Sequence, residues 1–380
     1  MKIRGAVLEE IGALRPYADS RPISISDLEL APPLSGEVLI RIEAAGVCHS
    51  DLSVVDGNRV RPVPMLLGHE AAGQVVELGD GVDDLHVGQR VVLAFLPRCG
   101  DCDGCKTDGL MPCVPGTVSN NAGTLLSGGS RLQRDDQQVH HHLGVSAFAT
   151  HAVVDRRSLV PVDDDVPPEV AAVLGCAVLT GGGAVINTAR PLPGQRLIVV
   201  GLGGVGMAAL LTALSCPGVE VIGVDTVPDK LELALGLGAS SVMTPAQAIE
   251  AGLKAHSVIE CAGNARAFET AVQLTAPGGK TVTVGLPAPT SKSEISPLGL
   301  VAEARTIIGS YLGSAVPSRD IPIFVKLWRD GKLPVERLIS ALIDVEEINE
   351  AMDNLANGQA VRQVVVFPDA EPGLGQSRTQ

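Results

Sequence analysis

The chain has 380 residues and a formal net charge of −14, with 19% charged and 45% hydrophobic residues. At roughly 100–200 residues per domain, this length predicts two domains with enough chain to bury a sizeable core. The composition excludes a disordered chain, and the negative charge disfavours nucleic acid or anionic lipid as the main partner. We therefore expect a soluble, acidic, globular protein.

Four of the eight cysteines lie within fifteen residues, and the other four are scattered along the chain. Clustered cysteines in a long chain favour metal binding in a reducing compartment over a disulfide framework. The N-terminus carries Lys2 and Arg4, but Glu9 and Glu10 follow before any long apolar run. This pattern does not match a signal peptide and predicts a cytoplasmic protein.

Short strands and turns are predicted for the first 160 residues. Residues 37–48 begin apolar and then alternate with polar side chains, as a strand with one exposed face does. Residues 71–79 and 89–95 have the pattern of two more strands, with a turn at Gly79-Asp80-Gly81. We expect an all-β, barrel-like first domain.

Two stretches without a charged residue, 170–189 and 197–219, are each long enough to cross a bilayer. Glycines interrupt both, at Gly175 and Gly181–Gly183 in the first stretch and in a GLGGVG motif in the second. We therefore interpret them as strand, turn and buried helix, and we expect no membrane partner.

Strands and helices alternate from about residue 190 onward, which predicts a doubly wound parallel sheet. Amphipathic helices are expected over 321–352, and residues 359–367 have the pattern of a strand that rejoins the first domain. The tail after Pro368 has a flexible composition. The predicted strands are 196–201, 219–225, 257–263 and 280–285, and the predicted helices are 207–216, 229–239 and 267–276.

A glycine-rich turn follows the first of these strands and opens a helix. In such a turn the first glycine permits the sharp bend, the second lets the backbone approach a pyrophosphate, and the third lets helix pack on strand. Asp225 ends the next strand about 20 residues on, where a carboxylate can bind the ribose hydroxyls. The motif predicts dinucleotide binding through Gly201, Gly203, Gly204, Val205 and Gly206.

Asp225 also bears on the choice of cofactor. Its carboxylate repels a 2′-phosphate, and the residues that follow it are Thr226, Val227 and Pro228, none of them basic. The sequence therefore favours NAD over NADP. Lys230 is a candidate for a ribose contact, and a solvated surface lysine is the alternative for it.

Cys99, Cys102, Cys105 and Cys113 have the spacing C-x2-C-x2-C-x7-C. Four thiolates suit a closed, tetrahedral structural zinc site, which stabilises folding and leaves no open position for chemistry. The first three spacings also match an iron–sulfur run. The fourth does not, because Cys113 comes late and Val114 follows it where that motif has proline. The cluster therefore favours zinc.

Three further ligand candidates are Cys48 in GVCHSD, His69 in GHE and Cys176 in GCAVLTG. Each alone is more commonly a buried core residue. Together, two thiolates and one imidazole leave the fourth position of a zinc ion open, as a catalytic zinc requires. Their charge cancels that of Zn²⁺, so the site can stabilise a bound alkoxide.

The order of these motifs, from GVCHSD through GHE, the four clustered cysteines, GC-x3-TG and GLGGVG to Asp225, resembles the zinc-dependent medium-chain alcohol dehydrogenases. The resemblance extends from about residue 3 to 367. It implies a GroES-like, β-rich catalytic domain over 1–178 and 316–380, and a Rossmann NAD-binding domain over 179–315. It also implies two zinc ions per subunit, one catalytic and one structural.

The resemblance assigns roles residue by residue. Cys48, His69 and Cys176 take the catalytic zinc, and the clustered cysteines take the structural one. Ser50 matches the hydroxyl that accepts the substrate proton, Asp51 the carboxylate that orients the zinc-bound histidine, and Glu70 the acid beside the zinc. The cofactor positions that match are His49 and Arg362 for the pyrophosphate and Thr180 for the nicotinamide.

Ser53 departs from the family pattern, since many liver-type members have a histidine there that passes the proton to solvent. A serine is not a base near neutral pH, so we expect a different pH dependence of turnover, or release through water. The segment 114–139 resembles the liver-type and formaldehyde-type branches and suggests a homodimer. His140–His142 could form a third metal site, although surface or packing histidines are the favoured interpretation.

Together, the motifs and the family resemblance predict reversible NAD-dependent oxidation of primary or secondary alcohols to aldehydes or ketones. Two alternatives stay open: an S-(hydroxymethyl)thiol (formaldehyde) dehydrogenase, and an inactive protein that binds zinc and nucleotide. No basic cluster for a charged thiol is evident in the sequence, and the channel should be aliphatic, with Phe95, Leu96 and Leu125 as candidate walls. Cys216 and Cys261 are expected to be small core residues.

Overall fold

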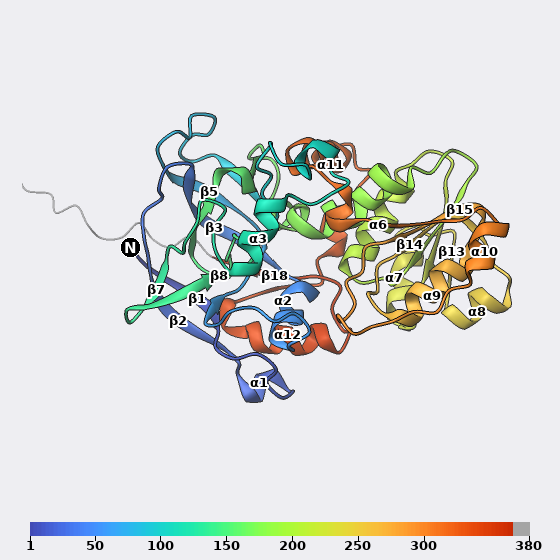
Figure 1. Ribbon diagram of the computed structural model, residues 1–380, viewed down its shortest axis with the longest axis horizontal. Helices are drawn as coiled ribbons and strands as arrows, with labels where there is room; N and C mark the ends of the chain where they lie inside the picture. Colours follow the sequence, from blue (N-terminus) through green and yellow to red (C-terminus); the bar gives the residue numbers. More distant parts are fainter. Residues whose placement is uncertain (368–380) are drawn as a thin grey trace, which may run out of the picture.

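The structure is a computed structural model, and it describes residues 1–367. Two lobes lie side by side, one built on a barrel and a mixed sheet and the other on a parallel sheet flanked by helices (Figure 1). The expected fold class, a GroES-like domain with a Rossmann domain, is confirmed. The prediction for the tail lies outside the described residues.

The first lobe contains a small closed barrel. Its strands follow the order β1-β2-β7-β8-β4. The barrel has its own small core, which contains Ile3, Leu28 and Leu125. Leu125 is one of the candidate walls of the substrate channel in the sequence analysis. The prediction for Leu125 is wrong because the barrel encloses its side chain. The strands are β1 (Lys2–Leu8), β2 (Ile23–Leu30), β4 (Met65–Leu66), β7 (Leu132–Arg134) and β8 (Gln137–His141).

A mixed sheet forms the rest of the first lobe. Its order is β10-β6-β5-β3-β18-β17, and β9 also pairs with β3. The expected C-terminal strand pairs antiparallel with β3 in the register Gln363↔Val47, so the chain does return to its first lobe. The strands are β3 (Glu37–Val47), β5 (Glu70–Leu78), β6 (Arg90–Ala94), β9 (His151–Asp155), β10 (Leu159–Pro161), β17 (Ala341–Ile343) and β18 (Gln363–Val366).

The second lobe has a six-stranded parallel sheet in the order β13-β12-β11-β14-β15-β16. This order reverses direction between β11 and β14, and ligands of such sheets bind at the carboxyl ends of the strands there. The strands are β11 (Arg196–Val200), β12 (Glu220–Val224), β13 (Ser241–Met243), β14 (Ala255–Glu260), β15 (Thr275–Thr283) and β16 (Thr306–Gly309).

The helices agree with the predicted alternation in the second lobe. Over 321–352 the expected amphipathic helices are present as α11 and α12, and the strand β17, which was not expected, lies between them. The helices are α1 (Tyr17–Ser20), α2 (His49–Val55), α3 (Val114–Ala122), α4 (Pro168–Val173), α5 (Leu179–Gly183), α6 (Gly204–Leu214), α7 (Pro228–Gly236), α8 (Pro245–Glu250), α9 (Ala265–Leu274), α10 (Pro297–Ala302), α11 (Pro317–Arg329) and α12 (Ile348–Ala356).

Within 170–189 the expected buried helix is present, but the expected strand and turn are wrong. Residues 168–189 form one helical run in which α4 and α5 alternate with the π-helical turns Leu174–Val178 and Ala184–Ala189. The glycines serve close packing here, since a Cβ on Gly181 would collide with the Val205 carbonyl of α6. The run is long and apolar enough to cross a membrane, but 83% of its most apolar window is buried, as in the core helix of a soluble protein.

Candidate active site

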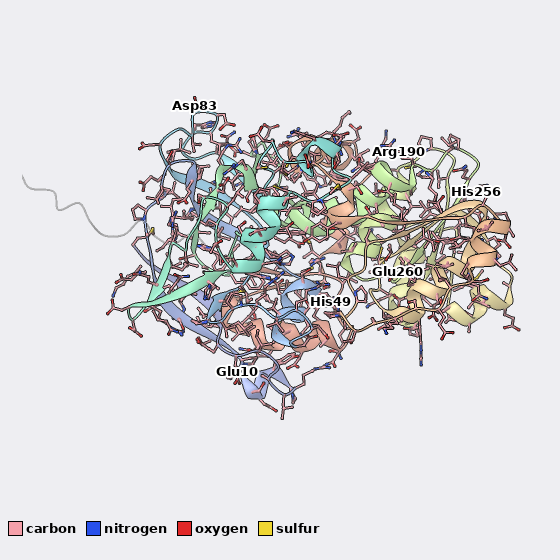
Figure 2. The ribbon with its side chains drawn as sticks, viewed as in Figure 1. Glu10, His49, Asp83, Arg190, His256 and Glu260 are labelled. Carbon is pink, nitrogen blue, oxygen red and sulfur yellow. The ribbon has the colours of Figure 1, made fainter. Side chains whose placement is uncertain are left out.

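A cavity of about 390 Å³ lies between the lobes, and residues of both line it. His49 lies where the lobes meet (Figure 2). Four residues of the predicted catalytic and cofactor sites do not line the cavity: Asp51, His69, Glu70 and Gly206. The predicted site residues on the wall are Cys48, His49, Ser50, Cys176, Thr180, Gly201, Gly203, Gly204, Val205, Asp225, Lys230 and Arg362.

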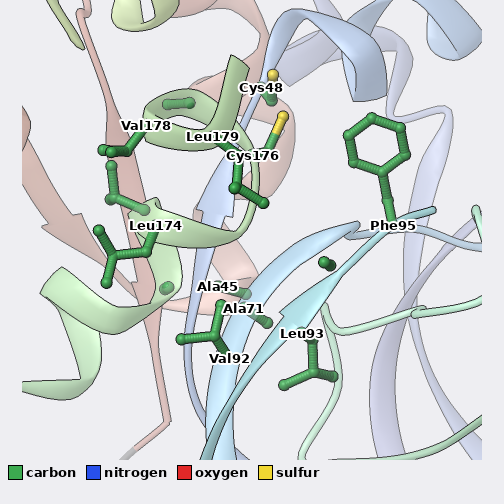
Figure 3. Packing of buried hydrophobic residues seen from close by; sticks show 14 of the residues in the cluster. Ala45, Cys48, Ala71, Val92, Leu93, Phe95, Leu174, Cys176, Val178 and Leu179 are labelled. Atoms are coloured by element: carbon green, nitrogen blue, oxygen red, sulfur yellow. The ribbon is translucent and has the colours of Figure 1, made fainter. Parts of the chain in front are cut away.

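Cys48, His69 and Cys176 converge although they are far apart in the sequence. Cys48 follows β3 and caps helix α2, His69 immediately precedes β5, and Cys176 lies in a π-helical turn of the long core helix. Their ligand atoms lie within 4.8 Å of one another. The sulfurs of Cys48 and Cys176 lie side by side, with the ring of Phe95 nearby (Figure 3).

The donor set fits zinc. The Nε2 atom of His69 is buried and has no hydrogen-bond partner among residues 1–367, so it is available to a metal ion. A hydrogen bond from the Cys176 thiol lowers the pKa of Cys48, which favours a thiolate. A zinc ion held by two sulfurs and one imidazole nitrogen would keep one tetrahedral position open for substrate, and both cysteines line the cavity.

Asp51 holds His69 from behind. Its Oδ1 lies 3.0 Å from His69 Nδ1, and its Oδ2 accepts a hydrogen bond of 3.0 Å from the Cys48 backbone N–H. Burial raises the pKa of this carboxyl group, but His69 and His142 outweigh burial and lower it to about 2. Asp51 therefore stays ionised, directs the Nε2 atom of His69 away from itself and ties both ligand segments together.

The three consecutive histidines diverge, so they do not form a metal site of their own. His142 lies 3.1 Å from Asp51 through Nδ1, as a second histidine on the same carboxylate. His141 accepts a hydrogen bond of 3.2 Å from the Arg131 backbone N–H inside the barrel. Both are buried, and their environment is that of packing histidines.

Glu70 and Arg362 form a buried pair beside the thiolates. Arg362 donates to the Val47 carbonyl at 3.0 Å and lies 3.5 Å from Glu70 Oε1. The other carboxylate oxygen of Glu70 accepts from the Ala177 N–H at 3.0 Å. Burial raises the pKa of Glu70 to about 7, against the opposing charge of Arg362. A Cβ on Gly46 would occupy the space of the Glu70 carboxylate, so this position requires glycine.

The glycine turn between β11 and α6 fits a dinucleotide. Gly201 has φ +89°, which a side chain disfavours, and a Cβ on Gly203 would meet no atom within 4 Å. The Asp225 carboxylate accepts hydrogen bonds from the backbone N–H groups of Leu202 (2.6 Å) and Val227 (2.9 Å). It is thereby held on the cavity wall, where it can accept from ribose hydroxyls.

The clustered cysteines form a second, separate site. The sulfurs of Cys99 and Cys105 are 3.8 Å apart, and those of Cys102 and Cys113 are 4.0 Å apart. A tetrahedron with Zn–S bonds of about 2.3 Å has edges of about 3.8 Å. Backbone N–H groups of Val114 and Cys105 point to Cys102 and lower its pKa to about 6. The four sulfurs therefore fit a closed structural zinc site.

Sequence reasoning missed part of the cavity wall. Phe95 lies on it as expected, whereas Leu96 is packed in the core. Cys261 packs against the core and also lines the cavity. Arg59 and Tyr311 were not singled out, because no local pattern shows that these segments return to the site.

Comparisons with known proteins agree with this geometry. Residues 34–164 match the alcohol dehydrogenase GroES-like domain, and residues 204–329 match the zinc-binding dehydrogenase family. The chain is 34% identical over 380 residues to alcohol dehydrogenase B of Mycobacterium tuberculosis, covering 97% of this chain and 99% of that protein. This chain belongs to the zinc-dependent medium-chain alcohol dehydrogenases.

Two further relatives of this dehydrogenase bear on its activity. S-(hydroxymethyl)glutathione dehydrogenase of Synechocystis sp. is 32% identical over 378 residues, which cover 97% of this chain and all of that protein. Benzyl alcohol dehydrogenase of Acinetobacter calcoaceticus has the same fold with a TM-score of 0.88 at 31% identity, covering 97% of this chain and 100% of that one. The chain is therefore similar to relatives whose names give different substrates.

Proposed function

We propose that this dehydrogenase oxidises primary or secondary alcohols reversibly, using NAD and one of two zinc ions in each subunit. The observation that carries the proposal is that one cavity joins the open Cys48–His69–Cys176 site to the glycine turn and Asp225. Alcohol oxidation requires both a group that activates the hydroxyl and a hydride acceptor in contact with the same carbon.

Different residues at the site would bind the metal ion, orient its histidine ligand and accept the substrate proton. Cys48, His69 and Cys176 would hold the catalytic zinc, and Asp51 keeps the imidazole in the tautomer that presents Nε2 to it. When bound, zinc lowers the pKa of the substrate hydroxyl and the nicotinamide accepts the hydride. Ser50, on the first turn of α2 and on the cavity wall, accepts the substrate proton at Oγ.

Ser53 does not extend this proton path as a base. Its hydroxyl donates to the Ser50 carbonyl at 2.9 Å, and both serines line the cavity. We therefore infer that the proton leaves Ser50 through water in the cavity.

On the cofactor side, we propose that Gly201, Gly203, Gly204, Val205 and Gly206 surround the pyrophosphate with His49 and Arg362. Asp225 and Lys230 take the adenosine ribose, and Thr180 lies at the nicotinamide. A Cβ on Gly204 would come within 2.5 Å of Arg362 Nη2, so glycine there keeps the guanidinium beside the turn. Burial lowers the pKa of His49, so this residue contributes a neutral ring near pH 7.

Replacing Asp225 with Gly tests the cofactor assignment. The substitution removes the ribose acceptor and the charge that repels a 2′-phosphate, so we expect kcat/KM for NAD to fall by about 10- to 100-fold. The ratio of kcat/KM for NAD to that for NADP should fall further. Steady-state kinetics with both cofactors measure this, and Asp229→Gly, on the first turn of α7, is the control. An unchanged ratio would contradict the role of Asp225.

The rate of NADH formation with primary, secondary and benzylic alcohols tests the function, with formaldehyde added with and without a low-molecular-weight thiol. We expect turnover of free alcohols without thiol. Turnover only with formaldehyde plus thiol would instead establish the activity of the Synechocystis relative. Bound zinc and NAD without any turnover would show an inactive binding protein.

We further propose a cytoplasmic homodimer. The domain boundaries at 178/179 and 315/316 stay a prediction, in which 1–178 and 316–380 form the catalytic domain and 179–315 the nucleotide domain. Size-exclusion chromatography with light scattering measures the subunit number.

A further inference from the structure

Arg59 is a cation on the cavity wall without a counterion. It follows the C-terminal end of α2, and it lines the cavity together with Phe95 and Tyr311. Within residues 1–367 its guanidinium makes no ion pair and no side-chain hydrogen bond. A half-buried cation usually has an anionic partner, so the lack of one marks a binding position.

Arg61 lies beside Arg59 and is also not neutralised. Its Nη1 donates to the neutral Asn121 amide oxygen at 2.7 Å, while its Nε is buried without a partner. Burial and the charge of Arg59 together lower the pKa of Arg61, and both arginines act on the Tyr311 hydroxyl. Arg59 and Tyr311 therefore line the cavity, and Arg61 adds positive charge near them without lining it.

Acidic residues of the cavity do not compensate these charges. The Asp56 carboxylate accepts two hydrogen bonds of 2.8 Å from Asn58, and it forms no ion pair with Arg59. Asp225 is held by the glycine turn on the nucleotide side. Arg59 follows α2, whose first turn carries Ser50, so we place it on the substrate side.

Two aromatic contacts connect Tyr311 to His69 of the candidate zinc site. Phe95 makes edge-on contacts with His69 at 5.5 Å and with Tyr311 at 6.1 Å between ring centroids. Phe95 therefore contacts both His69, a candidate zinc ligand, and Tyr311. A substrate that reaches both places therefore extends along Phe95, which lines the cavity.

We propose that Arg59 forms an anion subsite on the cavity wall, with Arg61 adding positive charge nearby, and that this subsite binds a carboxylate of the substrate away from its alcohol group. This inference rests on the proposed function and narrows its substrate class to alcohols or aldehydes with a distal carboxylate. A guanidinium offers two parallel donors that match the two oxygens of a carboxylate, and Tyr311 adds a hydroxyl donor.

The test compares 4-(hydroxymethyl)benzoate and 6-hydroxyhexanoate, each with its own methyl ester, as substrates of the zinc-loaded protein with NAD. We expect a higher kcat/KM for the acids, mainly through KM. In Arg59→Gln the ratio of acid to ester should fall by about 10- to 100-fold. Raising the ionic strength should lower this ratio in the unmodified protein and hardly affect it in the variant.

The exposed Arg337 is the matched control, because Arg337→Gln removes the same charge away from the cavity and should leave the ratio unchanged. Calorimetric titration of 4-(hydroxymethyl)benzoate into the zinc- and NADH-loaded protein provides a readout without turnover, and we expect about tenfold weaker binding in Arg59→Gln. Equal use of acids and esters, unaffected by Arg59→Gln, would overturn the subsite and leave the alcohol dehydrogenase intact. Arg59-dependent binding without turnover of any alcohol would support the subsite and overturn the proposed function.

Discussion

Replacing Cys176 with Ser is expected to lower kcat/KM for alcohol oxidation by more than about 1,000-fold. The metal supplies several kcal/mol of charge stabilisation in the transition state, and each 1.4 kcal/mol is a factor of ten. Cys176 is one of three donors, and its thiol lies within 4.8 Å of the other two ligand atoms. A hydroxyl in its place is a poor zinc ligand at neutral pH, so the ion leaves or loses its geometry.

Metal content and kinetics measured on the same preparation check this expectation. Zinc should fall from two ions per chain to about one, while NADH binding, followed by fluorescence, persists because the glycine turn is unchanged. Cys216→Ser is the control, since this thiol is partly buried, donates to the Thr212 carbonyl at 3.6 Å and is not one of the candidate metal ligands among residues 1–367. Full activity and two zinc ions in Cys176→Ser would remove Cys176 from the catalytic site.

Replacing Cys113 with Ser should instead act on stability. Cys113 is fully buried, caps helix α3 and receives the N–H groups of Cys99 and Gly116 on its sulfur. Loss of a closed metal site removes its binding free energy from the folded state, so we expect a destabilisation of about 4 kcal/mol or more. The folded fraction should keep its kcat, because this site has no open position.

Denaturant unfolding and zinc analysis measure this effect, again with Cys216→Ser for comparison. Zinc should fall to one ion per chain in Cys113→Ser, and the remaining ion should sit at the site used for turnover. An unchanged midpoint with both zinc ions retained would show that the cluster does not contribute to folding. A visible iron–sulfur absorption in the unmodified protein would contradict zinc at this cluster.

The sequence predicts the role of Asp51 beside His69 but not that of His142. Asp51 was assigned from its place in GVCHSD, and the structure brings its carboxylate to 3.0 Å from His69. For His142 the sequence favours a surface or packing histidine over a ligand of a third metal site, yet its ring lies 3.1 Å from the same carboxylate. Asp51 also binds the Cys48 N–H within a single helical turn, so its place is set locally. The position of His142 depends on how the barrel packs against α2.

Local patterns by themselves determined the features whose partners are near in sequence. The glycine turn and Asp225 follow from one strand–helix–strand unit, and the four clustered cysteines span only fifteen residues. The alternation of strands and helices also predicted the parallel sheet, because short apolar runs alternate with helical segments at regular spacing.

The tertiary structure decided the relations between distant segments. Pairing of β3 with β5 and the π-helical turn of the core helix bring Cys48, His69 and Cys176 together, and in the sequence only the family resemblance connected them. Close packing made 168–189 helical despite its glycines, and the chain after α2 placed Arg59 on the cavity wall. Such contacts depend on non-local packing, for which a sequence read in short windows carries no periodic signal.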